Sequence, residues 1–247
     1  MERMTLTKNR RILQVEGAYN VRDLGGYRTK DGRTTRWGTI YRADGLHRLT
    51  QAGRQTIEDL GVRMVIDLRH GRELQEKRSV FEGSDSVAYR NVSLLNPVSP
   101  YSRQMDSLGD VYIGLLEDCR HELRSVFALL AERGDEAVLF HCAAGKDRTG
   151  IVAALLLELA GVERETIIED YMLTAMCIAP LLEELRRGRP PMAAEDEYEK
   201  LLGCEPGNMR EMLRHVEQNY GNAERYLLAI GLQPDQVRAV KERLLAR

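Results

Sequence analysis

The chain has 247 residues, of which 43% are hydrophobic and 30% are charged, and its formal net charge is -2. This length and composition suit one globular domain over residues 1–247, and the near-neutral charge argues against a nucleic-acid-binding surface. No segment is long and apolar enough to be an integral membrane span, and residues 1–17 lack the apolar core of a signal peptide. We therefore expect a cytoplasmic protein, with export without a cleavable signal left open, and take a monomer as the default.

The cysteines are scattered along the chain, at Cys119, Cys142, Cys177 and Cys204, and form no Cys-x-x-Cys pair. This spacing argues against a disulfide framework and against a zinc site. Free thiols suit a reducing compartment, in which a cysteine can also serve as a nucleophile. We expect no metal and no cofactor.

The first predicted elements form a small antiparallel hairpin. Residues 12–16 and residues 37–42 have the composition of two short strands. Between them, the double glycine of N-V-R-D-L-G-G-Y (residues 20–27) indicates a tight bend, and K-D-G-R (residues 30–33) carries an Asp-Gly turn signal. We expect this hairpin to lie at one edge of a sheet.

A helix over residues 50–60 precedes a strand that is apolar along most of its length. Residues 62–68, V-R-M-V-I-D-L, resemble strands buried on both faces of a parallel sheet. The strand leads into Asp67 and Arg69. Charged residues at the carboxyl end of a parallel strand often line a ligand site.

Polar segments then lead to a long amphipathic helix. We predict a short helix over residues 71–79, a strand over residues 87–95 and a polar loop over residues 96–110. Residues 111–132 have the apolar spacing of one continuous helix, which Gly134 ends.

The most informative stretch begins with a predicted buried strand at residues 138–140. The small residues Ala143, Ala144 and Gly145 follow, and an apolar helix covers residues 151–159. A strand, a loop of small residues and a helix N-terminus can together bind an anion. Loop N–H groups can point inward, and the helix N-terminus adds partial positive charge.

Cys142 opens this loop and Arg148 closes it. A thiol beside backbone N–H groups and the cationic Lys146 and Arg148 is expected to ionise readily and to act as a nucleophile. The planar guanidinium of Arg148 can hold two oxygens of a phosphate. Thr149 offers a hydroxyl that can hydrogen-bond the thiolate and help its later release. The pattern favours catalysis through a phosphocysteine.

The rest of the chain is predicted to be helical. Residues 163–176, 209–220 and 237–245 each have helical spacing. Residues 177–208 instead mix flexible and apolar side chains and contain a Pro-Pro pair. We interpret them as a helical insert that forms a lid over the site, or as a helical hairpin packed on the core.

H-C-A-A-G-K-D-R-T-G, at residues 141–150, resembles the Cys-x5-Arg-Ser/Thr signature of the protein tyrosine phosphatase superfamily. It is most similar to the loop of the bacterial atypical phosphatases. N-x-R-D-L-G-G-Y, Y-R-A-D-G-L and D-Y-M-L-T resemble other segments of that group. The resemblance implies an α/β fold, with a central, mostly parallel sheet flanked by helices and a helical insert.

The resemblance also implies an activity. Members of this group are metal-independent hydrolases that act on phosphotyrosine, sometimes with dual specificity for phosphoserine and phosphothreonine, and often on phosphoinositides. The expected partner is therefore a phosphorylated protein or a phosphoinositide.

The roles that follow for the loop residues are those of a thiolate phosphatase. Cys142 attacks phosphorus, and the loop amides with Arg148 hold the three equatorial oxygens, so no metal is needed. Asp147 is the general acid that the resemblance implies. Lys146 contacts a second phosphate or only neutralises the first. The expected phosphate-binding residues are Ala143, Ala144, Gly145, Lys146, Asp147 and Arg148.

Other residues are candidates for support. Asp67 is either the alternative general acid or a structural partner of an arginine, and Arg69 follows it. His141 orients the loop or only packs, and Arg42 lies near the site or at the surface. In many tyrosine phosphatases a loop before the catalytic strand supplies the acid, which makes Asp106 and Asp110 candidates by position alone.

The loop has four other interpretations. A nucleotide-binding P-loop is excluded, because Asp147 follows Gly-Lys where that motif needs Ser or Thr. A buried structural cysteine does not account for Arg148 beside an apolar helix. A rhodanese-like sulfurtransferase and a module that binds phosphorylated ligands without turnover stay open as alternatives.

Overall fold

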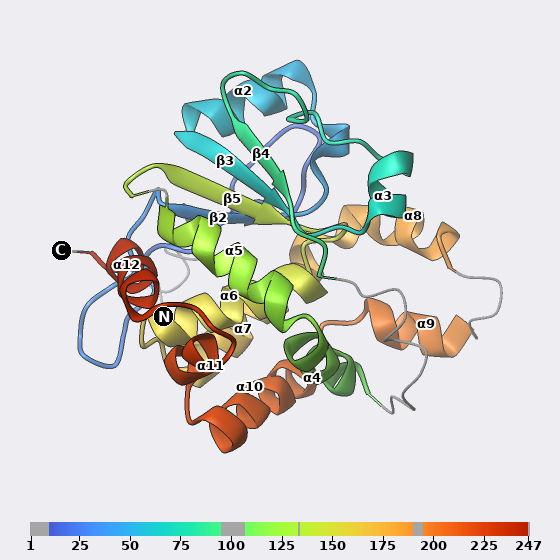
Figure 1. Ribbon diagram of the computed structural model, residues 1–247. Coiled ribbons are helices and arrows are strands. Elements are labelled where there is room, and N and C mark those ends of the chain that lie inside the picture. The colour runs from blue at the N-terminus through green and yellow to red at the C-terminus, as the bar shows by residue number, and fades with distance from the viewer. Residues whose placement is uncertain (1–9, 95–106, 133, 190–194, 247) are drawn as a thin grey trace.

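The computed structural model describes residues 10–132, except 95–106, together with residues 134–189 and 195–246 (Figure 1). Its centre is a five-stranded sheet with the order β1-β2-β5-β3-β4. β1 pairs antiparallel with β2, and the other neighbouring strands are parallel. The mostly parallel sheet with an antiparallel edge is therefore confirmed. The strands are β1 (Arg22–Asp23), β2 (Ile40–Ala43), β3 (Val62–Asp67), β4 (Ala88–Asn91) and β5 (Ala137–His141).

Helices flank this sheet on both faces (Figure 1). Those that precede β5 are α2 (Gln51–Asp59), α3 (Gly71–Glu76), α4 (Leu108–Asp118) and α5 (Arg120–Glu132). Those that follow β5 are α6 (Asp147–Leu159), α7 (Arg164–Cys177), α8 (Leu182–Arg187), α9 (Glu195–Leu202), α10 (Pro206–Tyr220), α11 (Ala223–Ala229) and α12 (Pro234–Leu244).

The prediction of one continuous helix over residues 111–132 is wrong. The chain breaks at Cys119, whose thiol donates to the carbonyl of Leu94 at 2.8 Å, so that α4 and α5 are separate helices. The apolar spacing continues through the break, which is why periodicity did not reveal it. α4 also begins inside the predicted polar loop, because Ser107 and Asp110 form a capping box there.

Two smaller predictions also need correction. Residues 12–16 do not form a strand; they make isolated bridges, Ile12 with Arg22 and Val15 with Ala18. Helix α11 was not predicted. The side chain of Asn222 caps this helix by accepting from the N–H of Arg225. Asparagine is a common N-cap residue, so the sequence is compatible with a helix that starts here.

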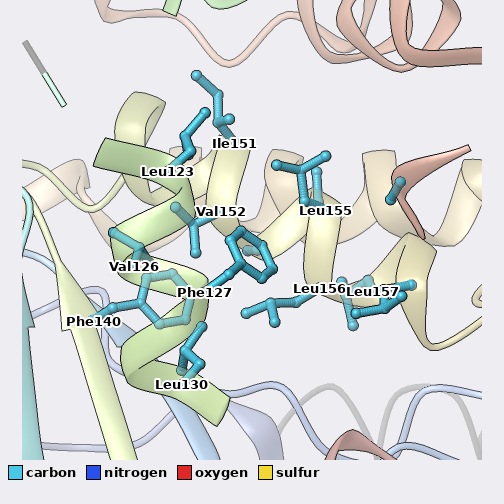
Figure 2. Close-up of a cluster of buried hydrophobic side chains, with 14 of the residues drawn as sticks. Leu123, Val126, Phe127, Leu130, Phe140, Ile151, Val152, Leu155, Leu156 and Leu157 are labelled. Atoms are coloured by element: carbon cyan, nitrogen blue, oxygen red, sulfur yellow. The ribbon is translucent and has the colours of Figure 1, made fainter. Parts of the chain in front are cut away.

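Side chains of the central strands alternate between two apolar cores. In β5, Val138 and Phe140 belong to the core on the side of α5 and α6, and Leu139 belongs to the core on the side of α2. Figure 2 shows side chains of α5 and α6 gathered around Phe127 and Phe140. Burial on both faces accounts for the nearly continuous apolar sequences of β3 and β5.

The strand register brings three chain segments to one edge of the sheet. Ala43 of β2 and Asp67 of β3 both pair with His141 of β5, and each of these residues ends its strand. Because the strands are parallel, the segments that follow them leave the sheet at the same edge. The segment after β5 is the loop that opens with Cys142.

Candidate active site

The loop from Cys142 to Arg148 connects β5 to α6, as predicted. Cys142 is buried, with 2% of its surface exposed. Gly145 adopts a positive φ of 68°, and a Cβ atom there would lie 2.5 Å from the carbonyl oxygen of Ala43. No larger residue fits this turn without moving the neighbouring strand.

Neighbouring segments hold the carbonyl groups of the loop. The N–H of Gly45 donates to the carbonyl of Ala143 at 2.9 Å. The amide nitrogen of Asn20 donates to the carbonyls of Ala144 and Gly145, both at 3.0 Å. Arg42 donates a further hydrogen bond to Gly145, at 2.8 Å.

These contacts fix the direction of the loop N–H groups. In a trans peptide the N–H points away from the carbonyl of the same unit. The N–H of residue 144 therefore points away from Gly45, and the N–H groups of residues 145 and 146 point away from Asn20 and Arg42. Within the described part of the chain, no protein group accepts from the N–H groups of residues 143–146. The loop therefore presents free donors beside Cys142, as an anion site requires.

A buried ionic cluster lies behind the loop. Arg42 is fully buried, which rules out a surface position, and donates to Asp170 of α7 at 2.6 Å. Nε of Arg22 lies 3.5 Å from the same carboxylate, and the hydroxyl of Tyr27 donates to it at 2.6 Å. Burial alone would raise the pKa of Asp170, but the charges of Arg22 and Arg42 lower it to about 2.

Arg148 is held by Glu73, a residue that sequence reasoning missed. The two terminal nitrogens of Arg148 donate to the two carboxylate oxygens of Glu73, at 2.7 and 2.9 Å. Glu73 also accepts from the N–H of His70 and so closes the capping box of α3. Burial alone would lower the pKa of Arg148, but the hydrogen bonds to Glu73 and the negative charge of Glu73 raise it.

This pairing leaves part of the guanidinium for a ligand. Arginine has five N–H donors. The end-on contact with Glu73 uses two of them, and Nη1 makes a long contact of 3.5 Å with the carbonyl of Leu68. The edge formed by Nε and the second hydrogen of Nη2 has no partner within the described residues.

Asp147 is the first residue of α6, and its position is fixed from α4. The hydroxyl of Tyr112 donates to Oδ1 of Asp147 at 2.6 Å, and Nζ of Lys146 lies 3.4 Å from the same oxygen. Tyr112 in turn contacts the hydroxyl of Tyr171 at 2.8 Å. Oδ2 of Asp147 has no partner among the described residues, and the side chain is 35% exposed. Tyr112 was also missed, because it sits on the apolar side of a helix.

Asp67 and Arg69, at the end of β3, form a buried ion pair. Nη2 of Arg69 donates to Asp67 at 2.7 Å, and the hydroxyl of Tyr89 donates to the same oxygen at 2.8 Å. The ring of His141 lies 3.4 Å from that oxygen. Burial alone would raise the pKa of Asp67, but His141 and the hydrogen bonds from Arg69 lower it to about 2. The carboxylate of Asp67 thus pairs with Arg69, and both of its oxygens accept hydrogen bonds.

His141 and Thr149 are both fully buried, and His141 directly precedes Cys142 in the chain. Nδ1 of His141 lies 3.0 Å from the carbonyl of Cys142, and burial lowers the pKa of this imidazole. The hydroxyl of Thr149 has no hydrogen-bond partner within the described residues.

Lys146 is directed toward the helical insert. Its ammonium donates to the carbonyl of Leu201 and, at 3.0 Å, to that of Gly203, and these two groups lie at the end of α9. Cationic side chains are stabilised by the free carbonyls of a helix C-terminus. No residue of α8 and no described side chain of α9 is buried.

Two further acids were candidates by position alone. Asp106 lies outside the described residues. The carboxylate of Asp110 accepts from the N–H and the hydroxyl of Ser107, both at 3.0 Å, at the N-terminus of α4.

Within the described ranges, no group of three or more His, Cys, Asp or Glu side chains has the arrangement of a metal site. In the same residues, no helix combines the length and apolarity needed to cross a bilayer.

The chain is similar to several known proteins. A family model described as "Tyrosine phosphatase family" matches residues 13–246. A tyrosine-protein phosphatase of Nostoc commune is 33% identical over 218 residues, which cover 81% of this chain and 71% of that protein. The triple specificity protein phosphatase PtpB of Mycobacterium tuberculosis is 26% identical, and the alignment covers 95% of this chain and 99% of that protein.

Among solved structures, the core catalytic domain of the PP-IP phosphatase SIW14 from S. cerevisiae superposes with a TM-score of 0.41 at 14% identity. The superposition covers 83% of this chain and 96% of that chain.

Proposed function

The chain belongs to the tyrosine phosphatase family and is a hydrolase of phosphate monoesters, and we propose that it works through a phosphocysteine formed on Cys142. One observation carries the proposal. Asn20, Arg42 and Gly45 hold the carbonyls of the loop, so that its N–H groups are free beside the buried thiol.

In the first step, the thiolate of Cys142 attacks phosphorus opposite the leaving oxygen. The sulfur–phosphorus bond forms as the bond from phosphorus to the leaving oxygen breaks. The loop N–H groups and the open edge of Arg148 hold the three equatorial oxygens as charge spreads over them. Glu73 keeps that edge in place, because it binds the other end of the guanidinium.

The leaving oxygen then needs a proton, and we assign Asp147 as its donor. Oδ1 of Asp147 is fixed by Tyr112, and Oδ2 is the oxygen left for the substrate. Asp67 is a poorer candidate because both of its oxygens are engaged and its pKa is about 2. A general acid needs a proton to give and reach to the leaving group.

In the second step, water attacks the phosphocysteine. Asp147, now a carboxylate, accepts a proton from this water, and the sulfur–phosphorus bond breaks to release inorganic phosphate. The unpartnered hydroxyl of Thr149 is available to donate to the departing thiolate. The cycle restores Cys142 as a thiolate and Asp147 as an acid.

Phosphotyrosine is the substrate that we propose first, because the family model and the Nostoc relative are both described as tyrosine phosphatases. Phosphoserine and phosphothreonine follow from the relative described as having triple specificity. Phosphoinositides are a further proposal that the resemblance of the loop supports.

Residues 177–208 are proposed to cover the site as a lid. α8 and α9 are joined by the ion pair of Arg186 with Glu199, at 2.7 Å, and α9 is attached to the loop through Lys146. A helix held by polar contacts, without buried side chains, can separate from its neighbours at low cost.

The assignment of Asp147 is tested by two substrates with different leaving groups. An alkyl phosphate needs protonation, whereas p-nitrophenol leaves readily as an anion. In Asp147→Asn, we expect kcat on the alkyl phosphate to fall about 100-fold or more, and kcat on p-nitrophenyl phosphate to fall much less. Wild-type turnover of the alkyl phosphate by Asp147→Asn would show that another group is the acid.

A further inference from the structure

A small pocket of about 120 Å³ lies beside the catalytic loop. It is bordered by Ala143 of the loop, by His47 and Arg48 after β2, by Lys77 after α3, and by Glu184 of α8. The segments that form it meet at the end of the molecule where α3 and α8 lie side by side (Figure 1). No residue of the pocket has a role in the steps proposed above, apart from Ala143 and Glu73.

Glu184 occupies the space between two cations. Nζ of Lys77 lies 2.5 Å from one oxygen of the Glu184 carboxylate, and Nη1 of Arg48 lies 3.2 Å from the other. The hydrogen bond from Lys77 and the charge of Arg48 lower the pKa of Glu184, although partial burial opposes them. At neutral pH the pocket therefore holds an anion that the chain itself supplies.

Two donor atoms of residues that line the pocket have no partner among the described residues. Nε of Arg48 is buried and has no hydrogen-bond partner in the described part of the chain. Nη1 of Arg48 lies 3.1 Å from Nε2 of His47; arginine can only donate, so this ring nitrogen accepts. The proton of a neutral His47 is then on Nδ1, which is also buried without a partner among the described residues.

Two cations meet at Glu184, and one of them also has a second anionic partner: Nη2 of Arg48 donates to the buried carboxylate of Asp44 at 2.8 Å. The pKa of His47 is lowered to about 4, first by burial and then by the nearby charges of Arg48, Lys77 and Arg69. Arg69 is neutralised by Asp67, and Glu73 is paired with Arg148. Glu76, exposed on α3, is the other carboxylate at the rim. The carboxylate of Glu184 thus meets two cations but leaves two buried donors unsatisfied.

We propose that this pocket is a subsite for a second phosphate group of the substrate, and that Glu184 occupies it until such a substrate binds. The inference rests on the proposed function, because the first phosphate occupies the catalytic loop. A phosphate dianion carries more charge than a carboxylate and offers three oxygens, so it can satisfy Arg48, Lys77 and His47 together. Its binding displaces Glu184 and frees α8 from the catalytic edge.

The test is the binding of alkylene bisphosphonates of increasing length, compared with methylphosphonate, by isothermal titration calorimetry. These probes are not hydrolysed, and a series is needed to match the separation of the two sites. We expect the best bisphosphonate to bind the wild type at least about tenfold more tightly than methylphosphonate. In Lys77→Gln this advantage should be lost.

Glu184→Gln removes the competing charge but keeps the size of the side chain. It should increase the bisphosphonate advantage by a further factor of about five to ten. The matched control is Glu183→Gln, because Glu183 is the neighbouring carboxylate of α8, is 67% exposed and contacts Arg187 instead. This variant should bind both probes as the wild type does.

The outcomes separate the inference from the proposed function. If methylphosphonate binds but no bisphosphonate binds more tightly, or if Glu184→Gln leaves the ratio unchanged, the subsite is refuted and the phosphatase proposal stands. If neither probe binds, the anion site of the loop itself is refuted, and the subsite falls with it. Hydrolysis of a soluble inositol bisphosphate, compared with the same headgroup in phosphatidylcholine vesicles, distinguishes a free from a lipid-borne substrate.

Discussion

At the scale of single residues, the reactivity of Cys142 depends on groups that never touch the substrate. Asn20 bonds to the carbonyls of Ala144 and Gly145, and Arg42 reinforces the second contact. If these carbonyls rotated inward, they would replace N–H donors by acceptors and repel a phosphate. The N-terminal motif therefore acts by setting the orientation of peptide groups 124 and 125 residues further along the chain.

Removing the Asn20 amide should reduce both catalysis and stability. In Asn20→Ala, we expect kcat/KM on p-nitrophenyl phosphate to fall about 10- to 100-fold, because the loop N–H groups lose their fixed direction. The free energy of unfolding should fall by about 1–3 kcal/mol, because buried carbonyls lose their donor. Steady-state kinetics and urea denaturation measure the two effects.

A surface asparagine provides the control for this change. Asn219→Ala removes an exposed amide that contacts His215 within α10. It should leave both quantities close to wild type. Wild-type kinetics in Asn20→Ala would show that the loop keeps its shape without this side chain.

At the scale of elements, α6 combines two functions. Its N-terminus presents Asp147 and Arg148, and most of its remaining residues are buried in the core. Near its C-terminus, Glu158 is an exception, because Oε2 is buried and has no hydrogen-bond partner among the described residues. Burial raises the pKa of Glu158 to about 7, against the lowering influence of Arg164 and Lys30.

Glu158 should make stability depend on pH. Between its ordinary pKa near 4.5 and the folded value of about 7, the folded state holds a proton that the unfolded state has lost. Stability from this group is therefore greatest below pH 4.5, and it declines as the pH rises to about 7. In Glu158→Gln, we expect a melting temperature that changes less between pH 5 and pH 8 and that exceeds wild type at pH 8.

The exposed residue Glu132 serves as the comparison for this titration. Thermal melts followed by circular dichroism should give parallel curves for Glu132→Gln and wild type. If Glu158→Gln kept the wild-type dependence on pH, the carboxyl group would not be responsible for it.

At the scale of the whole molecule, Asp170 connects three distant parts of the chain. It accepts from Tyr27 in the N-terminal segment and from Arg42 on β2, and its own helix packs beside α6. Arg22 and Arg42 are both fully buried, so they depend on this carboxylate for neutralisation. Asp170 also positions Arg42 against the catalytic loop.

Asp170→Asn should therefore be severe. We expect a loss of about 3–5 kcal/mol in the free energy of unfolding, because two buried guanidinium groups lose their partner. Asp31→Asn makes the same chemical change in the exposed pair with Arg33, and it should lower the free energy of unfolding far less. Equal losses of stability in the two variants, measured by urea denaturation, would contradict the role of Asp170 as the partner of the two buried arginines.

The sequence was sufficient for the loop and for the sheet around it. The spacing from Cys142 to Arg148 and the apolar strands β3 and β5 depend on nearby residues, and local patterns carry that information. Glu73 and Tyr112 could not be predicted, because their roles depend on contacts 75 and 35 residues away. Tyr112 also lies at a position with the apolar spacing of a core residue, so the sequence does not indicate that its hydroxyl has a role. Asp170 is the first residue of the D-Y-M-L-T segment, but its partners do not follow from sequence spacing.

The central claim is that Cys142 is the nucleophile of a metal-independent phosphatase. The most direct test is hydrolysis of p-nitrophenyl phosphate in the presence of a chelator, by the wild type and by Cys142→Ser. We predict that the wild type keeps its activity with chelator and that Cys142→Ser loses at least about 1000-fold in kcat. Turnover by Cys142→Ser at the wild-type rate, or loss of wild-type activity on chelation, would contradict the account.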